Sequence, residues 1–182
     1  ALMALFMGTI AFGMGAATNS RVRGAATMIA SGIRVAFSRS ASTSKSLRAV
    51  FDLDQNSMLI EEADLPMLVR RDDVTGADGA TGSTPQEQAA IQEAERLVKG
   101  PTAPRPLFKP ITAFGFDAED PSKGRELGHG VAFRRVEVSH QEDPILSGRA
   151  YLYFWPGGQT ERASIQVGRK GDTGDSGVIS IL

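Results

Sequence analysis

The chain has 182 residues, of which 41% are hydrophobic and 23% charged, so it is long enough to bury one hydrophobic core. Its 20 Lys and Arg and 21 Asp and Glu residues leave a net charge of -1, which gives no strong overall field for nucleic acid or anionic lipid. It contains no cysteine, which excludes disulfides, thiolate nucleophiles and zinc sites with cysteine ligands.

Residues 1–17 carry no charge and are typical of an apolar helix. They are too few to cross a bilayer, which takes about 20 apolar residues, so we expect the membrane segment to begin upstream of this stretch. A cleaved secretory signal is the competing interpretation, but Arg21 and Arg23 follow the apolar run instead of preceding it. Two small-xxx-small pairs allow close approach of helices, although they also fit the ordinary composition of a membrane helix. These pairs are Ala4 with Gly8 and Ala11 with Gly15.

The pattern predicts that the same helix continues through residues 18–44 in amphipathic form. Apolar residues recur there at steps of three and four, which places them on one helical face. Arg21, Arg23, Arg34 and Arg39 lie largely outside this stripe. We expect the stripe to pack on a core; it consists of Val22, Ala25, Ala26, Ile29, Ile33, Ala36 and Phe37.

Residues 45–182 predict a β-domain with an insertion at about 64–110. Two short apolar runs, 47–53 and 58–63, are separated by four turn-forming residues and indicate a β-hairpin. Within the insertion, a capping box predicts a short helix over 85–99, with Thr84 as N-cap, Pro85 at the first position and Glu87 closing the box. Its expected buried face holds Ala90, Ile91, Ala94, Leu97 and Val98. The loop and helix at 75–99 form a candidate partner-binding surface.

Beyond Pro110 the chain again alternates in the manner of short strands, at 111–117, 130–139, 148–156 and 162–168, and a last strand follows a Gly and Asp turn. The expected fold class is α+β, with a long N-terminal helix packed on an antiparallel β-sandwich-like domain.

No recognised catalytic motif surrounds either of the two histidines. His129 lies between glycines, and His140, near Glu142 and Asp143, is interpreted as one of a group of solvated turn residues. Asp172 and Asp175 are weak candidates for a calcium site in a GDTGDSG loop, and we favour an exposed turn. We therefore expect a protein that is not an enzyme and needs no cofactor.

Three segments carry a resemblance to a known family: the helix RVRGAATMIASGIRVAFSRSAS, the hairpin LRAVFDLDQNSMLIEE and the aromatic strand pair YLYFWPGGQTERASIQV. Together they resemble the minor pseudopilin of the H type in bacterial type II secretion, over about half of the chain. The insertion matches no part of that family. The basic leader of the family, with its Phe followed by Thr-Leu-x-Glu, would lie upstream of Ala1.

The resemblance implies a structural subunit that is held in the bacterial inner membrane by a single helix, with its β-domain in the periplasm. It implies that the subunit then joins a short filament with other minor pseudopilins and the major pseudopilin. Residues 1–17 would pack in the filament core through Ala4, Gly8, Ala11 and Gly15, and Val22, Ile29 and Ile33 would pack further along the helix. Two alternatives stay open: a minor pilin of a type IV pilus, with a role in DNA uptake, and a membrane-tethered β-domain that binds a ligand. Scattered basic residues such as Arg134, Arg149 and Arg162 argue against nucleic acid as a partner.

Overall fold

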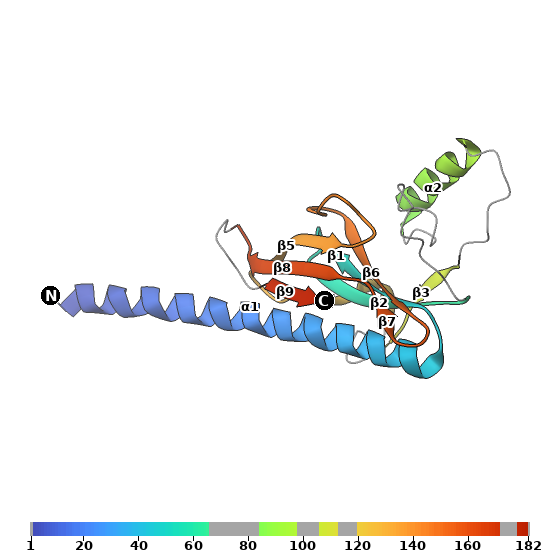
Figure 1. Cartoon of the computed structure of the whole chain (residues 1–182). Helices are drawn as coiled ribbons and strands as arrows, with labels where there is room; N and C mark the ends of the chain where they lie inside the picture. The colour runs from blue at the N-terminus through green and yellow to red at the C-terminus, as the bar shows by residue number, and fades with distance from the viewer. Residues whose placement is uncertain (1, 66–83, 98–105, 113–119, 172–177, 182) are drawn as a thin grey trace.

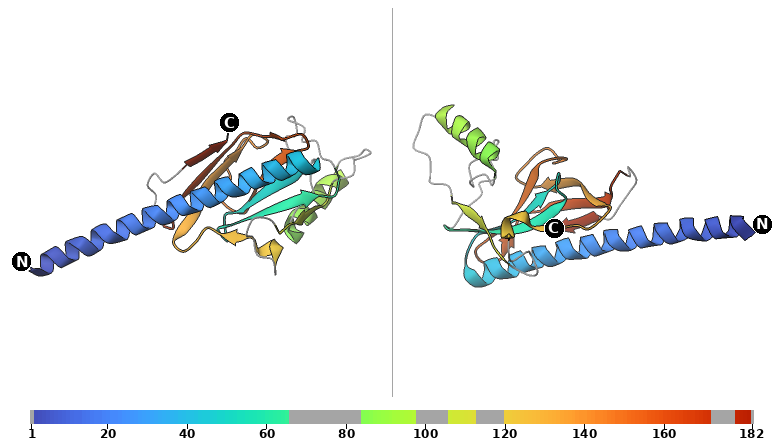
Figure 2. Two further views of the ribbon diagram at one scale, coloured as in Figure 1. Left: turned by 90° about the horizontal axis from the view of Figure 1, so that it is seen from below. Right: turned by 180° about the vertical axis from the view of Figure 1, so that it is seen from behind.

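One long helix precedes all the strands of the chain (Figure 1). The computed structural model describes residues 2–65, 84–97, 106–112, 120–171 and 178–181, and side chains within residues 19–65, 84–90, 92–93, 106–112 and 120–171. Helix α1 (Leu2–Thr43) has 42 residues and is therefore about 63 Å long. Its C-terminal half runs along the sheets, whereas its N-terminal half extends past them (Figures 1 and 2). The helix ends where Ser44 adopts a positive φ of 54°, a common C-terminal stop.

The C-terminal half of α1 buries the predicted stripe. Val22, Ala25, Ile29 and Ala36 are buried, and Ile33 packs on the same core. Phe37 is the exception, because it lies at the edge of the stripe and stays 40% exposed. Searched over the described residues, the chain has no helix with a stretch both long and apolar enough to cross a membrane.

The larger sheet has the strand order β3-β2-β1-β6-β7, with β4 also paired to β2. Its centre is the predicted hairpin of β1 (Leu47–Asp52) and β2 (Ser57–Ala63), which is confirmed with Phe51 opposite Met58. Asn56 in the connecting turn takes a positive φ of 54°, a conformation that asparagine tolerates well. Strand β6 (Arg149–Trp155) pairs antiparallel with β1, about a hundred residues earlier in the chain. The shorter strands are β3 (Phe108–Pro110), β4 (Arg125–Glu126) and β7 (Gln159–Thr160).

The smaller sheet has the order β5-β8-β9 and is also antiparallel. It consists of β5 (Val131–Val138), β8 (Ala163–Arg169) and β9 (Val178–Ile181), so the predicted strands at 130–139, 162–168 and the end of the chain are confirmed. The strand predicted at 111–117 is wrong at its start, because Ile111 and Thr112 follow β3 and belong to no strand; the rest of it lies outside the described residues. The coarse prediction of an N-terminal helix on antiparallel sheets thus holds.

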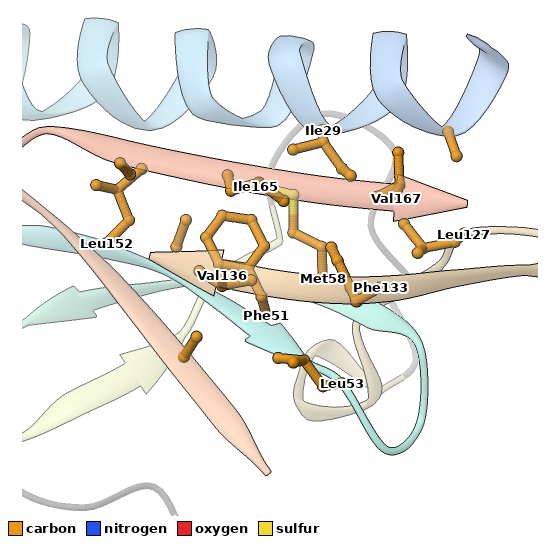
Figure 3. Packing of buried hydrophobic residues seen from close by; sticks show 14 of the residues in the cluster. Ile29, Phe51, Leu53, Met58, Leu127, Phe133, Val136, Leu152, Ile165 and Val167 are labelled. Carbon is orange, nitrogen blue, oxygen red and sulfur yellow. The ribbon is translucent and has the colours of Figure 1, made fainter. Parts of the chain in front are cut away.

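One core joins α1 to the inner faces of both sheets (Figure 3). Ile29 reaches down from α1 toward Ile165 and Val167 of β8, and the rings of Phe51 and Phe133 meet edge to face with centroids 5.7 Å apart. Every residue of β1 is buried, which shows that the other face of the large sheet is covered as well.

Two short helical segments lie outside this core: the 3-10 helix η1 (Pro121–Lys123) and helix α2 (Pro85–Leu97). The predicted capping box of α2 is confirmed: the backbone N–H of Thr84 donates to Glu87 at 3.0 Å, and the N–H of Glu87 donates to the Thr84 hydroxyl at 3.2 Å. Ala90, which we expected to be buried, is exposed; Ile91, Ala94, Leu97 and Val98 lie outside the described side chains.

Candidate functional site: helix α1 and the outer face of the large sheet

The predicted packing residues of α1 divide into two groups. Ala4, Gly8, Ala11 and Gly15 belong to the half of the helix that extends past the sheets, and their side chains lie outside the described part of the chain. Val22 and Ile29 are 9% and 0% exposed in the core of the chain itself, with Ile33 packed against it. These three residues hold α1 on its own domain.

The C-terminal end of α1 is attached to the large sheet by polar contacts. The hydroxyl of Ser40, fully buried, lies 2.7 Å from the carbonyl oxygen of Trp155 and 2.9 Å from that of Lys45. Glu62 of β2 accepts hydrogen bonds from Arg39 of α1 and from Lys45 in the linker. Burial opposes the charge of Glu62, but the hydrogen bonds from Lys45 and Arg39 outweigh it and lower the pKa of its carboxyl.

The outer face of the large sheet holds a buried ion pair, Arg48 of β1 with Glu61 of β2. The two side chains are 2% and 4% exposed, and their N–O distance is 2.6 Å. They stand directly opposite in the register of the hairpin, so strand pairing itself brings them together. Burial opposes the charged form of Arg48, but the Glu61 carboxylate beside it, aided by Tyr153 and Tyr151, raises the pKa of the guanidinium.

Aromatic rings enclose the Arg48 guanidinium on this face. Its central carbon lies 4.3 Å from the ring centroid of Phe108 and 4.4 Å from that of Tyr151, within the range of cation-π attraction. The hydroxyl of Tyr151 lies 2.7 and 2.8 Å from the carboxylate oxygens of Glu87, the residue that caps α2. Tyr151 therefore connects the capping residue of the insertion helix to the arginine.

A second buried pair, His140 with Glu161, lies beside Tyr153 on the same face. His140 Nδ1 is 2.7 Å from Glu161 Oε2, and the other carboxylate oxygen accepts the backbone N–H of Tyr153 at 3.0 Å. The Ser139 hydroxyl, 3.3 Å away, also donates to Glu161 instead of to the imidazole, so the three do not form a hydroxyl–imidazole–carboxylate relay. Burial raises the pKa of Tyr153, with the Arg48 charge opposing it and Glu161 and Glu61 adding to it.

Sequence reasoning missed this face of the sheet. It placed His140 among solvated turn residues with Glu142 and Asp143, which are indeed exposed, but the imidazole faces inward to Glu161. The signal available in the sequence was a pair of opposite charges, Arg48 and Glu61, at positions that face each other across the predicted hairpin. His140 and Glu161 continue the antiparallel register of β5 and β8, which pairs Val138 with Ala163 and Ser139 with Arg162, and this long-range pairing was not predicted from the sequence.

Most residues of the remaining predicted sites are not among those that the structure describes. Asp172 and Asp175 fall in residues that the structure does not describe, and so does 75–83 of the candidate partner-binding surface. Over the described ranges, no group of three acidic or histidine side chains could hold a metal ion.

Compared with protein families, curated proteins and solved structures, the chain matches none of them.

Proposed function

We propose that this chain is a structural subunit of a pilin-like filament, a minor pseudopilin of a bacterial type II secretion system. The observation that carries the proposal is the division of α1 into two halves. One half is packed on the chain's own sheets, and the other extends past them as an uncharged helix about 25 Å long (Figures 1 and 2). This geometry suits a subunit whose free helix packs against the same helix of its neighbours.

The composition of the first half supports both stages of the proposed cycle. An apolar helix is buried equally well by lipid tails and by other apolar helices, so transfer from the membrane to a filament changes the free energy little. Before assembly the helix lies in the inner membrane; afterwards it lies among the helices of other minor pseudopilins and the major pseudopilin. Ala4, Gly8, Ala11 and Gly15 allow the backbones to approach closely.

The attachment of α1 to the β-domain supports the same role. Ser40 and the Glu62 ion pairs fix the end of the helix, and Ile29 fixes its middle. When the free half of the helix is drawn into a filament, the β-domain therefore moves with it as one body.

The first test is the N-terminal sequence and intact mass of the mature protein from its native membranes. The proposal predicts an N-methylated Phe followed by Thr-Leu-x-Glu upstream of Ala1. A mature end near Thr18, or an unprocessed end, would overturn the filament and favour a secreted or tethered binding domain.

A second test uses the absence of native cysteines. Single substitutions Gly8→Cys and Gly15→Cys, each in the full chain and each produced together with a major pseudopilin that carries one cysteine in its own N-terminal helix, should give disulfide or bis-maleimide products between the two proteins in cells with the secretion machinery. Gln55→Cys, at an exposed position of the β1–β2 turn, is the control for random collision. Products that form equally in cells without the assembly machinery would contradict the filament and leave a protein that merely resides in the membrane.

The periplasmic location of the β-domain has its own test. Arginines that flank a membrane segment favour the cytoplasmic side, and Arg21 and Arg23 flank this one, so the expected orientation has to overcome that preference. Alkaline phosphatase fused after Leu182 should be active in intact cells. Activity that appears only in a cytoplasmic reporter fused at the same point would place the β-domain on the other side.

A further inference from the structure

The point where α1 leaves the sheets is built from α1 and the end of β8. Arg169, the last residue of β8, donates a hydrogen bond to the side-chain oxygen of Asn19 at 3.1 Å. Arg134 of β5 donates to the carbonyl oxygen of Arg169 at 2.7 Å, and the N–H of Lys170 donates to Gly130 at 2.9 Å. The end of β8 is therefore held beside the first turn of α1 that touches the domain.

Two exposed arginines of α1 lie at the same level, one on each side of the face that packs on the core. Arg21 and Arg23 precede and follow Val22, which faces the core, so each projects about 100° to one side of it. Lys170 is exposed on the side of the helix where β8 ends. We call these residues, Arg21, Arg23, Arg169 and Lys170, the basic collar.

The collar has a local charge that the neutral composition of the whole chain conceals. Four positive charges gather where α1 and the end of β8 meet, in a chain of net charge -1. Among the described residues, the exposed carboxylates of Asp54 and Glu126 belong to the β1–β2 turn and to β4, and not to either element of the collar; Asp172 and Asp175, which follow Lys170 in the chain, lie outside the described residues. The collar thus offers several flexible donors to phosphate groups, which Arg and Lys bind through charge-assisted hydrogen bonds.

We propose that the basic collar binds the head groups of anionic phospholipids at the surface of the bilayer. The proposal rests on the proposed function in one respect, since it takes the first half of α1 to lie in the membrane before assembly. With a rise of 1.5 Å per residue, Arg21 and Arg23 lie about 6 and 9 Å beyond Ala17, the end of the uncharged run. Arg21 is therefore expected within the head-group layer, which extends about 5–8 Å beyond the hydrocarbon on each side, and Arg23 at its outer edge.

The size of the effect follows from the attraction of a basic residue to an anionic leaflet. Each Lys or Arg near such a surface strengthens binding about fivefold at moderate salt. Arg21, Arg23 and Lys170 can be replaced without disturbing the Arg169 contact to Asn19. Removing all three should reduce the preference for anionic over zwitterionic vesicles by on the order of a hundredfold, and by less as salt screens the charges.

The test measures partition of the full chain, diluted from mild detergent, onto two kinds of sedimenting vesicle. One is pure phosphatidylcholine, and the other contains about a third phosphatidylglycerol, enough for a strongly negative surface. The collar variant is R21Q/R23Q/K170Q. The matched control is R34Q/K109Q/R162Q, which replaces three exposed basic residues outside the collar and removes the same net charge.

The wild type and the control should prefer the anionic vesicles, while the collar variant should bind both kinds alike and as tightly as the wild type binds phosphatidylcholine. If the collar variant keeps the preference, or both variants lose it equally, the inference is wrong. The proposed membrane helix is not affected by that result. If the wild type binds neither kind of vesicle, the membrane stage of the proposed function fails, and the inference fails with it. A collar variant that loses binding to a DNA duplex and keeps its lipid preference would assign the surface to nucleic acid and overturn the inference.

Discussion

Removal of either member of the buried Arg48–Glu61 pair should destabilise the chain strongly, but with different dependence on pH. In Arg48→Met, the Glu61 carboxylate stays buried without the Arg48 charge, or it takes up a proton. Glutamate in water has a pKa of about 4.3, so its protonation at pH 7 costs about 3.7 kcal/mol, which caps this part of the loss. The lost stacking of Arg48 on Phe108 and Tyr151 adds about 1 kcal/mol.

The pH dependence identifies the cause. The cost of protonating a glutamate falls to about 1.6 kcal/mol at pH 5.5, so Arg48→Met should regain about 2 kcal/mol relative to the wild type between pH 7 and 5.5. In Glu61→Gln the buried charge belongs to arginine, which does not lose its proton, so a loss of about 3–5 kcal/mol should be the same at both pH values. The double variant R48M/E61L should lie within about 2 kcal/mol of the wild type, because neither member of the pair is left buried without the other.

The assay is urea unfolding of the full chain in mild detergent, followed by tryptophan fluorescence. Trp155 is the sole tryptophan and packs beside Phe108 and Tyr153, so it reports on this face of the sheet. Arg125→Met, at an exposed position of β4, is the control and should change stability by less than about 0.5 kcal/mol. If Arg48→Met costs less than about 1 kcal/mol, equally at pH 7 and 5.5, the reasoning is refuted.

Three further predictions concern the joints of the fold, each measured by the same unfolding assay. Glu62→Gln should cost about 1 kcal/mol at pH 7 and nothing well below pH 4. The sign follows because a lowered pKa gives stability that is present above the unfolded value of about 4.3 and is lost as pH falls through the folded one; an equal loss at pH 3 would exclude this cause. Gly124→Ala should cost about 2 kcal/mol, since φ is +69° and the new Cβ would lie 2.7 Å from the Met58 carbonyl oxygen. Its control is Gly128→Ala, where φ is also positive but the new Cβ meets open space, and the expected cost is about 1 kcal/mol. Equal losses in the two variants would rule out the close contact at Gly124. Ile29→Ala should cost about 2–5 kcal/mol because it opens a cavity under α1. Phe37→Ala, at the exposed edge of the stripe, should cost less than about 1 kcal/mol. The reverse order would mean that α1 is rotated about its axis and presents a different face to the sheets.

The parts of the fold that the sequence predicted are those that local interactions decide. The hairpin of β1 and β2 follows from two alternating runs around a turn, and the start of α2 follows from the Thr84 and Glu87 capping box. Long-range pairing escaped prediction. Nothing near β1 in the chain indicates that β6 is its partner, and β3, β4 and β7 have two or three residues, too few to show a period. The strand expected at 111–117 is wrong at Ile111 and Thr112: Ile111 still donates a backbone hydrogen bond to Ile60, but further along β2 the partner is β4, a pairing that nothing near these residues in the sequence indicates.

The candidate site was predicted less well than the fold. The sequence placed the α1 stripe correctly apart from Phe37, which lies at the edge of the stripe and stays exposed although Ala36 and Ser40 on the same stretch of helix are fully buried. It could not place the His140–Glu161 pair, because that contact follows from the pairing of β5 with β8, which lie far apart in the chain. The sequence shows each basic residue of the collar, but not that they lie together. The contact between Arg169 and Asn19 brings the end of β8 beside Arg21 and Arg23 of α1.

The way α1 lies along the sheets also decides how the protein responds to force. A pull on the free end of the helix acts along its axis and is met at once by the contacts of Ile29, Ala36 and Ser40 with the strands beneath. Loaded in this direction, the contacts must slide together, whereas a pull at right angles would peel them apart one after another. The fold should therefore resist extraction along the helix at forces well above those that lift the helix from the sheets, and stretching single molecules from the two directions would measure that anisotropy.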